Sequence, residues 1–325
     1  METIVSGARP TGRLHLGHLH GALKNWVRLQ NDYRCFFFVA DWHALTTDYS
    51  SPQGIQQSTL EMVMDWLSLG LDPQRCVLFR QSRVKEHAEL YLLLSMITPV
   101  PWLERNPTYK DQIRELKGKD LSTYGFLGYP VLQAADIIMY KAHKVPVGVD
   151  QVPHVELTRE IVRRFNQIYR PIFPEPAVLL TETQKLPGLD GRKMSKSYRN
   201  AVFLSDTPKE IDQKLSRMMT DPARVRRQDP GEPEKCPAFH LHKIYCTPQE
   251  IEEVSKGCRT ASIGCLDCKK VMIKHVIADL APFREKRAVY EHRPADVEEV
   301  LVTGNRIAQE KAAETMDEVR GAVGL

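Results

Sequence analysis

The sequence predicts an α/β fold: a parallel sheet with helices on both faces, followed by a smaller all-helical domain. Two observations carry this prediction. Short apolar runs alternate with longer amphipathic segments through the first half of the chain. A stretch rich in Gly, Lys and Ser follows over residues 183–199, and mainly helical patterns come after it. Strand–helix alternation is typical of parallel sheets, whose ligands bind at the carboxyl ends of the strands.

The strands are predicted from short apolar runs, at residues 3–8, 35–40, 76–79 and 145–149. Cys35 and Cys76 open two of these runs and are expected to be small buried hydrophobes. Amphipathic spacing predicts the intervening helices, over residues 16–30, 52–69 and 84–96. The polar, Lys-rich residues 109–119 are expected to form a flexible loop beside the active site.

The second half is predicted to be helical over residues 208–219, 249–256, 266–290 and 295–323. We therefore predict four regions along the chain. These are a nucleotide-binding domain over residues 1–190, a mobile loop over 191–200, a helical domain over 201–295 and a C-terminal helix over 296–325.

Length and composition are those of an ordinary globular protein of about two domains. The chain has 325 residues, of which 42% are hydrophobic and 26% charged, and its net charge of +4 permits an anionic partner. Apolar runs such as residues 90–97 are shorter than the roughly 20 residues of a membrane span. Residues 1–5 enter a strand-like run with no secretory pattern, so we expect a cytoplasmic protein that does not bind membranes.

The segment after the first strand has the composition of a phosphate site. A glycine-containing turn over residues 6–12 leads into Leu-His-Leu-Gly-His at residues 14–18. Such a turn presents backbone N–H groups to a phosphate as it enters a helix. His15 and His18 share one helical face, and their imidazoles can donate hydrogen bonds to phosphate oxygens. Gly17 lets a nucleotide ring approach the backbone. Two histidines at a helix start are, by themselves, often structural.

A second basic motif, Lys-Met-Ser-Lys-Ser, occupies residues 193–197. Lys193 and Lys196 can close over a triphosphate and stabilise its transition state through charge and position. A basic surface loop is the plainer reading of either lysine alone. Together and in this order, the two motifs resemble the signature pair of class I aminoacyl-tRNA synthetases.

Residues 129–138, Tyr-Pro-Val-Leu-Gln-Ala-Ala-Asp-Ile-Ile, narrow this resemblance. With residues 145–151 and 154–159 they are similar to the tryptophanyl and tyrosyl subclass. The Ala-Ala-Asp-Ile run and the upstream residues 41–44 resemble the bacterial tryptophanyl enzymes. The resemblance covers essentially the whole chain, and it implies a Rossmann-like catalytic domain and a helical anticodon-binding domain.

The spacing of Tyr129, Gln133 and Asp136 places them on one helical face. Tryptophan needs an apolar slot and one acceptor, because its indole N–H is only a donor. Asp136 is the candidate acceptor, and a buried, unpaired carboxylate would reject phenylalanine. The resemblance implies that Tyr129, Gln133 and Gln151 hold the α-amino group and that His43 lies near the pocket. Gln133 stands where many tryptophanyl enzymes carry Met, and Gln is familiar from tyrosyl enzymes, so tyrosine stays open as the substrate.

The resemblance also assigns the ATP site, and it makes His15, His18, Lys193 and Lys196 the catalytic residues. Asp150 would accept from the ribose hydroxyls, Gly148 would allow close approach, and Leu186 would pack near adenine. The full set of ATP-binding residues is Arg9, Pro10, Thr11, Gly17, His18, Gly148, Val149, Asp150, Leu186, Lys193, Met194, Ser195, Lys196 and Ser197.

The implied reaction joins L-tryptophan to its tRNA in two steps. The tryptophan carboxylate attacks the α-phosphate of ATP, bound with Mg²⁺, and the terminal adenosine of tRNA-Trp then attacks the adenylate. The resemblance implies a homodimer. Three alternatives stay open: a tyrosyl-tRNA ligase, an iron–sulfur RNA-binding protein without ligase activity, and a small-molecule nucleotidyltransferase.

Four cysteines near the C-terminus have the spacing C-x21-C-x6-C-x2-C, at Cys236, Cys258, Cys265 and Cys268. Four thiolates suit zinc or a [4Fe–4S] cluster. The spacing is similar to that of bacterial tryptophanyl enzymes with a [4Fe–4S] cluster in the anticodon-binding domain, where the first gap is about one residue longer. Zn²⁺ and four reduced cysteines remain alternatives. Cys246 is expected to be a spectator.

A basic cluster at Arg224, Arg226 and Arg227 is expected to lie beside this metal centre. We expect the centre to staple the helical domain and to shape a surface for the tRNA anticodon beside these arginines. Specific recognition of single-stranded RNA reads splayed bases at their edges.

Overall fold

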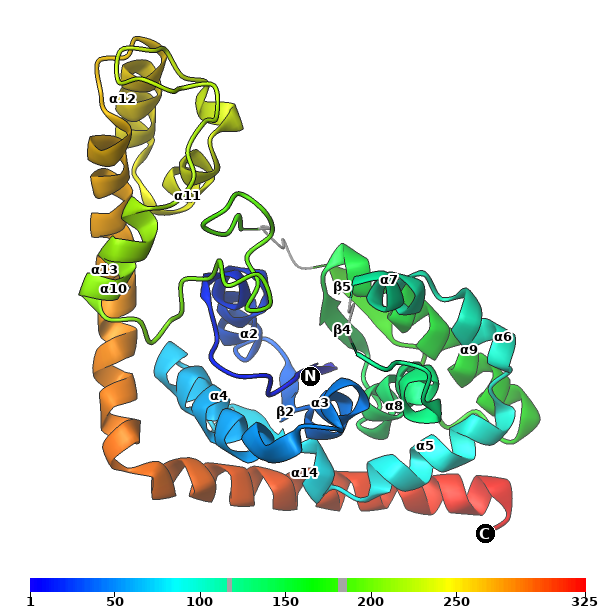
Figure 1. The fold of residues 1–325 in the computed structure, drawn as a ribbon. Coiled ribbons are helices and arrows are strands. Elements are labelled where there is room, and N and C mark those ends of the chain that lie inside the picture. Colours follow the sequence, from blue (N-terminus) through cyan, green and yellow to red (C-terminus); the bar gives the residue numbers. More distant parts are fainter. Residues whose placement is uncertain (116–118, 181–185) are drawn as a thin grey trace. The chain divides into compact units, whose positions relative to one another are not determined.

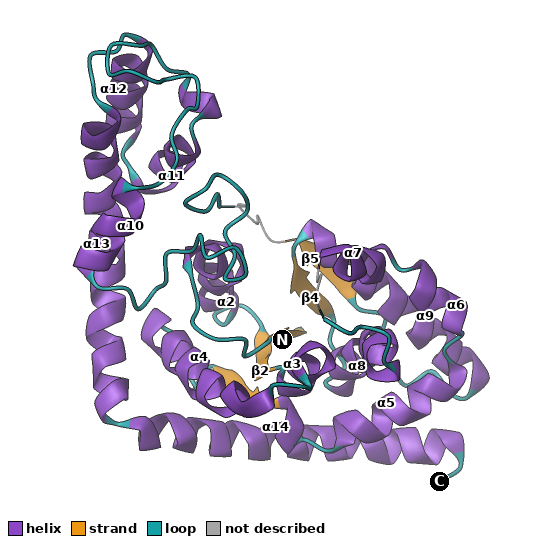
Figure 2. Ribbon diagram, viewed as in Figure 1, coloured by secondary structure: helices purple, strands orange, loops and turns teal. Residues whose placement is uncertain are grey.

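The computed structural model describes residues 1–115, 119–180 and 186–325, and it has a five-stranded parallel sheet (Figures 1 and 2). The strands have the order β3-β2-β1-β4-β5. Their bounds are β1 Thr3–Ala8, β2 Arg34–Val39, β3 Cys76–Arg80, β4 Lys144–Val147 and β5 Ala177–Leu180. The predicted α/β class with a parallel sheet is confirmed. The sequence analysis did not identify β5, whose four residues follow a Pro-rich stretch.

β1 lies between β2 and β4, so the order of the strands reverses at β1. In parallel sheets the crevice at such a reversal, at the carboxyl ends of the strands, is where ligands bind. The register pairs Ala8 with Val39 and Val39 with Arg80, so β1, β2 and β3 end at one edge. The segments after these strands therefore carry the candidate site.

The chain divides into two compact units. Unit 1 comprises residues 1–12, 25–182 and 290–325, and unit 2 comprises residues 13–24 and 183–289. The second unit therefore contains the short segment with His15 and His18 as well as the helical part. The predicted domain boundaries at residues 190, 200 and 295 stay a prediction.

Unit 1 buries its sheet under helices. These are α3 Asp41–Asp48, α4 Ile55–Leu69, α5 Glu86–Ile97, α6 Val100–Arg105, α7 Pro107–Glu115, α8 Tyr124–Met139, α9 Val152–Ile168 and α14 Pro294–Val323. Phe36, Phe79 and Tyr140 are fully buried, and Phe36 stacks on Tyr140. α14 packs against β3 so closely that a Cβ at Gly304 would collide with the carbonyl oxygen of Leu78. Glycine is required there because two backbones meet.

The expected loop over residues 109–119 is wrong for residues 109–115, which belong to α7. Pro107 fits the first turn of a helix, and the Asn106 side chain accepts from Thr108 N at 3.0 Å. These two signals start the helix despite its polar composition. Residues 116–118 lie outside the described part of the chain.

The helix predicted over residues 16–30 is divided into three pieces. α1 (Leu16–His18) and α2 (Lys24–Leu29) flank a π-helical turn, η1 (Leu19–Leu23). π-turns occur frequently at functional sites. Hydrophobic spacing alone did not reveal the change of period.

Unit 2 is mainly helical, with α10 Pro208–Ser216, α11 Pro237–Tyr245, α12 Pro248–Arg259 and most of α13 Cys265–His292. Thr207 and Glu210 form a capping box for α10, and Thr247 and Glu250 form one for α12. Such boxes satisfy two N–H groups at a helix start. No helix in the described residues is long and apolar enough to cross a membrane.

Candidate active site and metal centre

A buried carboxylate on α8 is the centre of the site in unit 1. Asp136 is 1% exposed and contacts three side chains from other segments. His43 Nε2 lies 2.7 Å from its Oδ2, and His87 Nδ1 lies 2.6 Å from its Oδ1. Gln81 Nε2 donates to both oxygens, at 2.8 and 2.9 Å. These contacts therefore fix the position of the buried carboxylate.

The expectation that Asp136 is an unpaired carboxylate is wrong. Burial opposes its ionisation, but the hydrogen bonds from His43 and His87 outweigh burial and hold the pKa of Asp136 below its ordinary value. Asp136 is thus charged at neutral pH. A carboxylate has about four lone-pair positions, and His43, His87 and Gln81 already make four contacts to them, so a further donor would have to share or displace one of these contacts.

Tyr129 lies one helical turn before Gln133 on α8 and stands edge-on to His43, with ring centroids 6.5 Å apart. Its hydroxyl lies 3.1 Å from His154 Nε2, and burial raises its pKa above the ordinary value. Gln133 is half-buried, and Gln151 donates to Asp150 at 3.1 Å. The structure therefore brings Tyr129, His43 and Asp136 into one buried network and leaves Gln133 and Gln151 at more open positions.

The segments after β1 and β4 carry the other predicted residues of unit 1. Arg9 and Thr11 are exposed after β1, and Pro10 between them is buried. Gly148 precedes the 3₁₀ turn η4 (Val149–Gln151), where Val149 and Asp150 are exposed. These residues stand at the carboxyl edge of the sheet, as expected for a ligand site.

Two histidines in unit 2 cap each other's backbone. His15 Nδ1 accepts from Gly17 N at 3.1 Å, and His18 Nδ1 accepts from His15 N at 3.1 Å. A neutral imidazole that accepts at Nδ1 carries its proton on Nε2. Both rings therefore present an Nε2–H donor. A Cβ on Gly17 would lie 2.9 Å from the ring of His15, so the glycine permits this arrangement.

Both imidazoles are neutral at physiological pH. Burial, followed by the charges of Lys196 and Lys193, lowers the pKa of His15 to about 4. Burial also lowers the pKa of His18 well below its ordinary range, and His15 and the two lysines lower it further. A Cβ on Gly17 would lie 3.8 Å from Met194 Cβ, so the structure brings the two predicted motifs together within unit 2.

The lysine motif is shaped by Asn200, which is 2% exposed. Asn200 Oδ1 accepts from Ser195 N at 2.8 Å, and Nδ2 donates to Asp190 Oδ1 at 2.7 Å and to Lys193 O at 3.2 Å. Met194 is buried and donates its N–H to Leu186 O at 3.0 Å, whereas Lys193 and Ser197 are exposed. The lysines therefore extend from a loop whose backbone is fixed by hydrogen bonds to the buried side chain of Asn200 and to Leu186 O.

Gln81, His87 and Asn200 are the site residues that the sequence analysis missed. Each of them holds a predicted residue in place. Gln81 follows β3 in the 3₁₀ turn η3 (Gln81–Arg83), so the rule that sites follow strand ends could have found it. His87 and Asn200 have no sequence signal of their own, because their roles depend on tertiary contacts.

The four cysteines come from the ends of three helices in unit 2. Cys236 precedes α11, Cys258 lies in the last turn of α12, and Cys265 and Cys268 lie in the first turn of α13. Burial, followed by the other three sulfurs, raises the pKa of Cys268 to about 12. Within the described residues, no three of the four sulfurs lie within 4.8 Å of one another. Any three of them therefore include at least one pair of sulfurs farther apart than the about 3.8 Å that tetrahedral zinc at 2.3 Å would impose.

Two buried cations accompany these sulfurs. Arg224 is 8% exposed and its Nη1 lies 3.9 Å from Cys258 Sγ, so it lies beside these cysteines, as expected, and is buried there. Lys269 is 5% exposed and donates to Ser216 O at 2.8 Å, and the sulfurs of Cys265, Cys236 and Cys268 lie close enough to influence its pKa. Arg226 and Arg227 are exposed. Buried cations beside thiols fit a centre of net negative charge.

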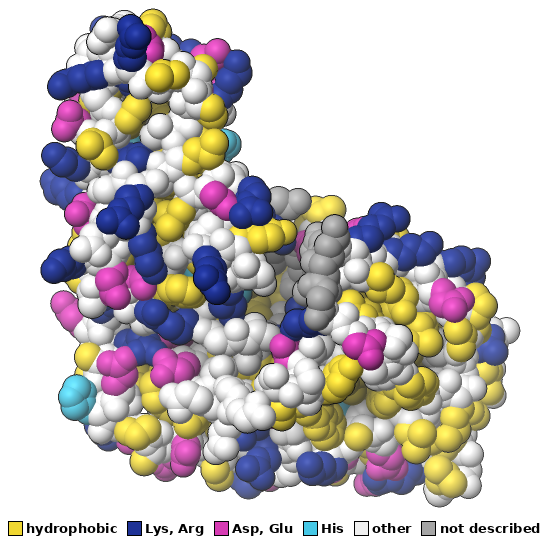
Figure 3. All heavy atoms as spheres, in the orientation of Figure 1, with side chains coloured by type: hydrophobic (Ala, Val, Ile, Leu, Met, Phe, Trp, Pro, Cys, Tyr) yellow, Lys and Arg dark blue, Asp and Glu magenta, His cyan; other side chains and the backbone are white. Residues whose placement is uncertain are grey.

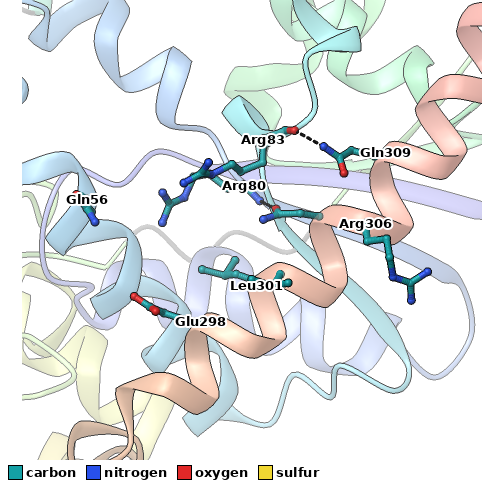
Figure 4. Close-up of a pocket in the computed structure, with 9 residues that line it drawn as sticks. Gln56, Arg80, Arg83, Glu298, Leu301, Arg306 and Gln309 are labelled. Atoms are coloured by element: carbon teal, nitrogen blue, oxygen red, sulfur yellow. Dashed lines mark hydrogen bonds between the residues drawn. The ribbon is translucent and has the colours of Figure 1, made fainter.

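A further pocket in unit 1, of about 510 Å³, lies between α14, α4 and the end of β3 (Figure 4). Arg80, Arg83 and Arg306 line it together with Glu298. Asn305 Oδ1 accepts from Arg80 N at 2.9 Å, and Gln309 donates to Arg83 O at 2.7 Å. None of the predicted site residues lines this pocket.

Comparisons with known proteins agree on one family. The family model described as tRNA synthetases class I (W and Y) matches residues 2–281. The tryptophan–tRNA ligase of Thermotoga maritima is 56% identical, over 99% of each chain. That of Ralstonia nicotianae is 48% identical, over 100% of this chain and 98% of its own. The tryptophanyl-tRNA synthetase of Campylobacter jejuni, solved with ADP and tryptophan, is 34% identical, covers 100% of both chains and has a TM-score of 0.89.

Proposed function

This chain belongs to the class I tRNA synthetases for tryptophan and tyrosine, and we propose that the site built around Asp136 is where it selects tryptophan. The chain is a tryptophan–tRNA ligase, which activates L-tryptophan with ATP and transfers it to tRNA-Trp. The full-length similarity to ligases of this name supports that activity over a tyrosyl ligase, a nucleotidyltransferase or a binding protein without activity.

The observation that carries the tryptophan site is the charged, fully held carboxylate of Asp136. We propose that it accepts the indole N–H, and that Tyr129, Gln133 and Gln151 hold the α-amino group. His43 fixes the position of Asp136. An apolar substrate without a donor would gain no hydrogen bond from this buried charge and would therefore bind more weakly than tryptophan.

Within unit 2, we propose that the Nε2–H groups of His15 and His18 and the ammonium groups of Lys193 and Lys196 bind the phosphates of ATP. Neutral donors and fixed charges stabilise the charge that develops on the phosphates during adenylate formation. Gly17, Met194, Ser195, Ser197 and Leu186 would shape this phosphate and adenine site. Mg²⁺ would accompany ATP and share the phosphate charge.

Within unit 1, we propose that Asp150 accepts from the ribose hydroxyls and that Gly148 and Val149 allow the nucleoside to approach the backbone. Arg9, Pro10 and Thr11 would contact ATP from the turn after β1. The tryptophan carboxylate would attack the α-phosphate and release pyrophosphate. The 2′-hydroxyl of the terminal tRNA adenosine would then attack the adenylate, without a covalent enzyme intermediate.

Amino-acid-dependent exchange of pyrophosphate into ATP tests this proposal. We expect exchange with tryptophan and at least about 100-fold less with tyrosine. This expectation follows from the full-length similarity to tryptophan–tRNA ligases, because both an indole N–H and a tyrosine hydroxyl can donate to Asp136. Lys196→Ala is expected to slow exchange while tryptophan binding stays nearly unchanged, because the lysine acts on the phosphates. Equal loss of binding and exchange would contradict that role.

We propose that Cys236, Cys258, Cys265 and Cys268 hold a [4Fe–4S] cluster. The donor set fits, the two buried cations suit its negative charge, and the wide sulfur spacing fits a cube of irons and sulfides better than one zinc ion. The cluster would tie three helices together without taking part in the ligation. An ultraviolet–visible spectrum of anaerobically purified protein should show a broad band near about 400 nm; a colourless protein with one zinc per chain would show the alternative.

We propose that unit 2 binds the tRNA anticodon through its basic surface. Lys and Arg side chains are spread over the face formed by α12 and α13 (Figure 3), and Arg226 and Arg227 are exposed. This location would make the predicted regions 201–295 and 296–325 an anticodon-binding domain and a terminal helix, and 191–200 the moving loop. Binding carried by these charges should weaken steeply as salt rises.

We propose that the ligase is a cytoplasmic homodimer. α5 and the start of α6 expose three apolar side chains, Leu92, Met96 and Val100, each more than half exposed. Such a patch is typical of an interface. Light scattering should give twice the mass of one chain; Met96→Glu should lower it, and Leu266→Glu on α13 should not.

A further inference from the structure

Three metal-ligating side chains lie together in unit 2, apart from the four cysteines. They are Cys246 at the end of α11, Glu250 in the first turn of α12 and His275 on α13. One sulfur, one carboxylate oxygen and one ring nitrogen all lie within 4.8 Å of one another. The three side chains are half-buried, so an ion could reach them from solvent.

Neighbouring groups hold each donor in place. Glu250 Oε2 accepts from Thr247 N at 2.9 Å and from Thr247 Oγ1 at 3.0 Å, as part of the capping box. The other oxygen, Oε1, lies 2.9 Å from His275 Nε2. Cys246 Sγ lies 3.3 Å from Nδ1 of the buried His242. Bonds of this kind orient the ligands of metal sites.

The donor types indicate which ion fits. A thiolate, an imidazole and a carboxylate are all ligands that zinc takes, at about 2.0–2.3 Å, and three protein ligands leave a fourth position for water. A plain His–Glu ion pair would explain His275 and Glu250. It would not explain why the sulfur of Cys246 lies within 4.8 Å of a donor atom of each of these residues. A divalent ion would balance both anionic ligands.

We propose that Cys246, Glu250 and His275 bind one zinc ion, with the thiol proton released to solvent as the ion binds. The ion would join the α11–α12 connection to the middle of α13. This site is separate from the four-cysteine centre. His242 links the two, because its Nε2 lies 3.3 Å from Cys268 Sγ. The expected spectator Cys246 then becomes a ligand.

Cysteine alkylation resolved by peptide mass spectrometry tests the proposal in the anaerobically purified full-length protein. One equivalent of Zn²⁺ beyond any metal already held should slow alkylation of Cys246 at least about 10-fold. His275→Gln and Glu250→Gln should remove most of that protection. Glu250→Gln keeps a side chain that can form the capping box, so the helix start is retained. The readout concerns Cys246 alone and does not depend on what the other four cysteines hold.

The controls are His240→Gln on α11 and Glu253→Gln on α12, both exposed residues. Both should protect Cys246 as the unmodified chain does. Cys35 and Cys76, buried in unit 1, should stay unreactive in every variant and so report a folded chain. The proposal fails if zinc leaves Cys246 alkylation unchanged, or if His275→Gln and Glu250→Gln are protected as fully as the controls.

Discussion

Asp136 sets the chemistry of the site in unit 1, and side chains from other segments of the chain fix its position and its charge. Asp136 was found from the resemblance of its motif to the tryptophanyl enzymes, and its helical spacing and apolar neighbours agreed with that role. Its partners Gln81 and His87 come from segments more than 45 residues earlier, at sequence separations of 55 and 49. Residues so far apart in the sequence share no helical or strand periodicity that could predict their contact. The identity of a ligand can thus be inferred from a motif, while its charge state requires the fold.

Asp136→Asn tests the charge at this position. An amide nitrogen in place of one carboxylate oxygen would face a donor, either His43 or His87, and a buried polar group would lose its partner. We expect kcat/KM for tryptophan in pyrophosphate exchange to fall roughly 100-fold, from a loss of about 2–3 kcal/mol. The KM for ATP should stay close to that of the unmodified enzyme. A fall in exchange of less than about threefold would show that the charge is not needed.

Helices and strands with strong periodicity were predicted well, and those set by capping or by partners were not. β1 was predicted at its observed bounds, and α13 and α14 were predicted to within two residues at each end. α7 begins at a proline and an asparagine cap, and β5 exists because it pairs with β4. The lysine loop is likewise organised by one buried amide, Asn200, that lies outside the motif.

Asn200→Ala tests that organisation. Removal of the side chain frees Ser195 N and Lys193 O, so the two lysines lose their fixed positions. We expect kcat for adenylate formation to fall at least about 10-fold, while the dissociation constant of tryptophan changes less than about twofold. Single-turnover measurements with separate tryptophan titration would distinguish the two. A matched control is Asn166→Ala, which removes a comparable buried set of backbone contacts at the end of α9.

Gly304→Ala tests the packing of α14 on β3. Alanine ordinarily favours a helix over glycine by about 1 kcal/mol, but here the new Cβ meets the carbonyl of Leu78. We expect a net destabilisation of about 2–3 kcal/mol, measured by urea unfolding. Gly125→Ala on α8, where a Cβ meets nothing within 4 Å, should be neutral or stabilising. Similar shifts for both variants would remove the steric explanation.

At the scale of the whole molecule, histidines that burial keeps neutral make the free energy of unfolding of both units depend on pH. Burial lowers the pKa of His20 in unit 2 and of His154 in unit 1 to about 4. The unfolded chain, with a histidine pKa near 6.5, binds protons between these values while the folded chain does not. Above pH 6.5 these histidines are neutral in both states and do not oppose folding. As the pH falls from 6.5 toward 4, protonation of the unfolded chain increasingly favours unfolding.

We therefore expect the free energy of unfolding to decrease on acidification from pH 6.5 to 4, by up to about 1.4 kcal/mol per pH unit for each such histidine. His20→Gln and His154→Gln should each flatten this slope, because glutamine takes up no proton. Denaturant unfolding at several pH values measures it. Equal slopes in the two variants and the unmodified chain would contradict the assignment.

Unit 1 is built from three separate stretches of the chain, and this affects how it folds during synthesis. β3 is complete by residue 80, but α14, which packs against it, begins at residue 294. A ribosome adding about 5–20 residues per second needs roughly 10–40 s to cross that interval. During this time β3, at the edge of the sheet, lacks the helix α14 that later packs against it. A nascent chain of this ligase should therefore depend on chaperones until its last helix emerges, and premature termination before residue 294 should yield a product that is degraded rather than a partly active enzyme.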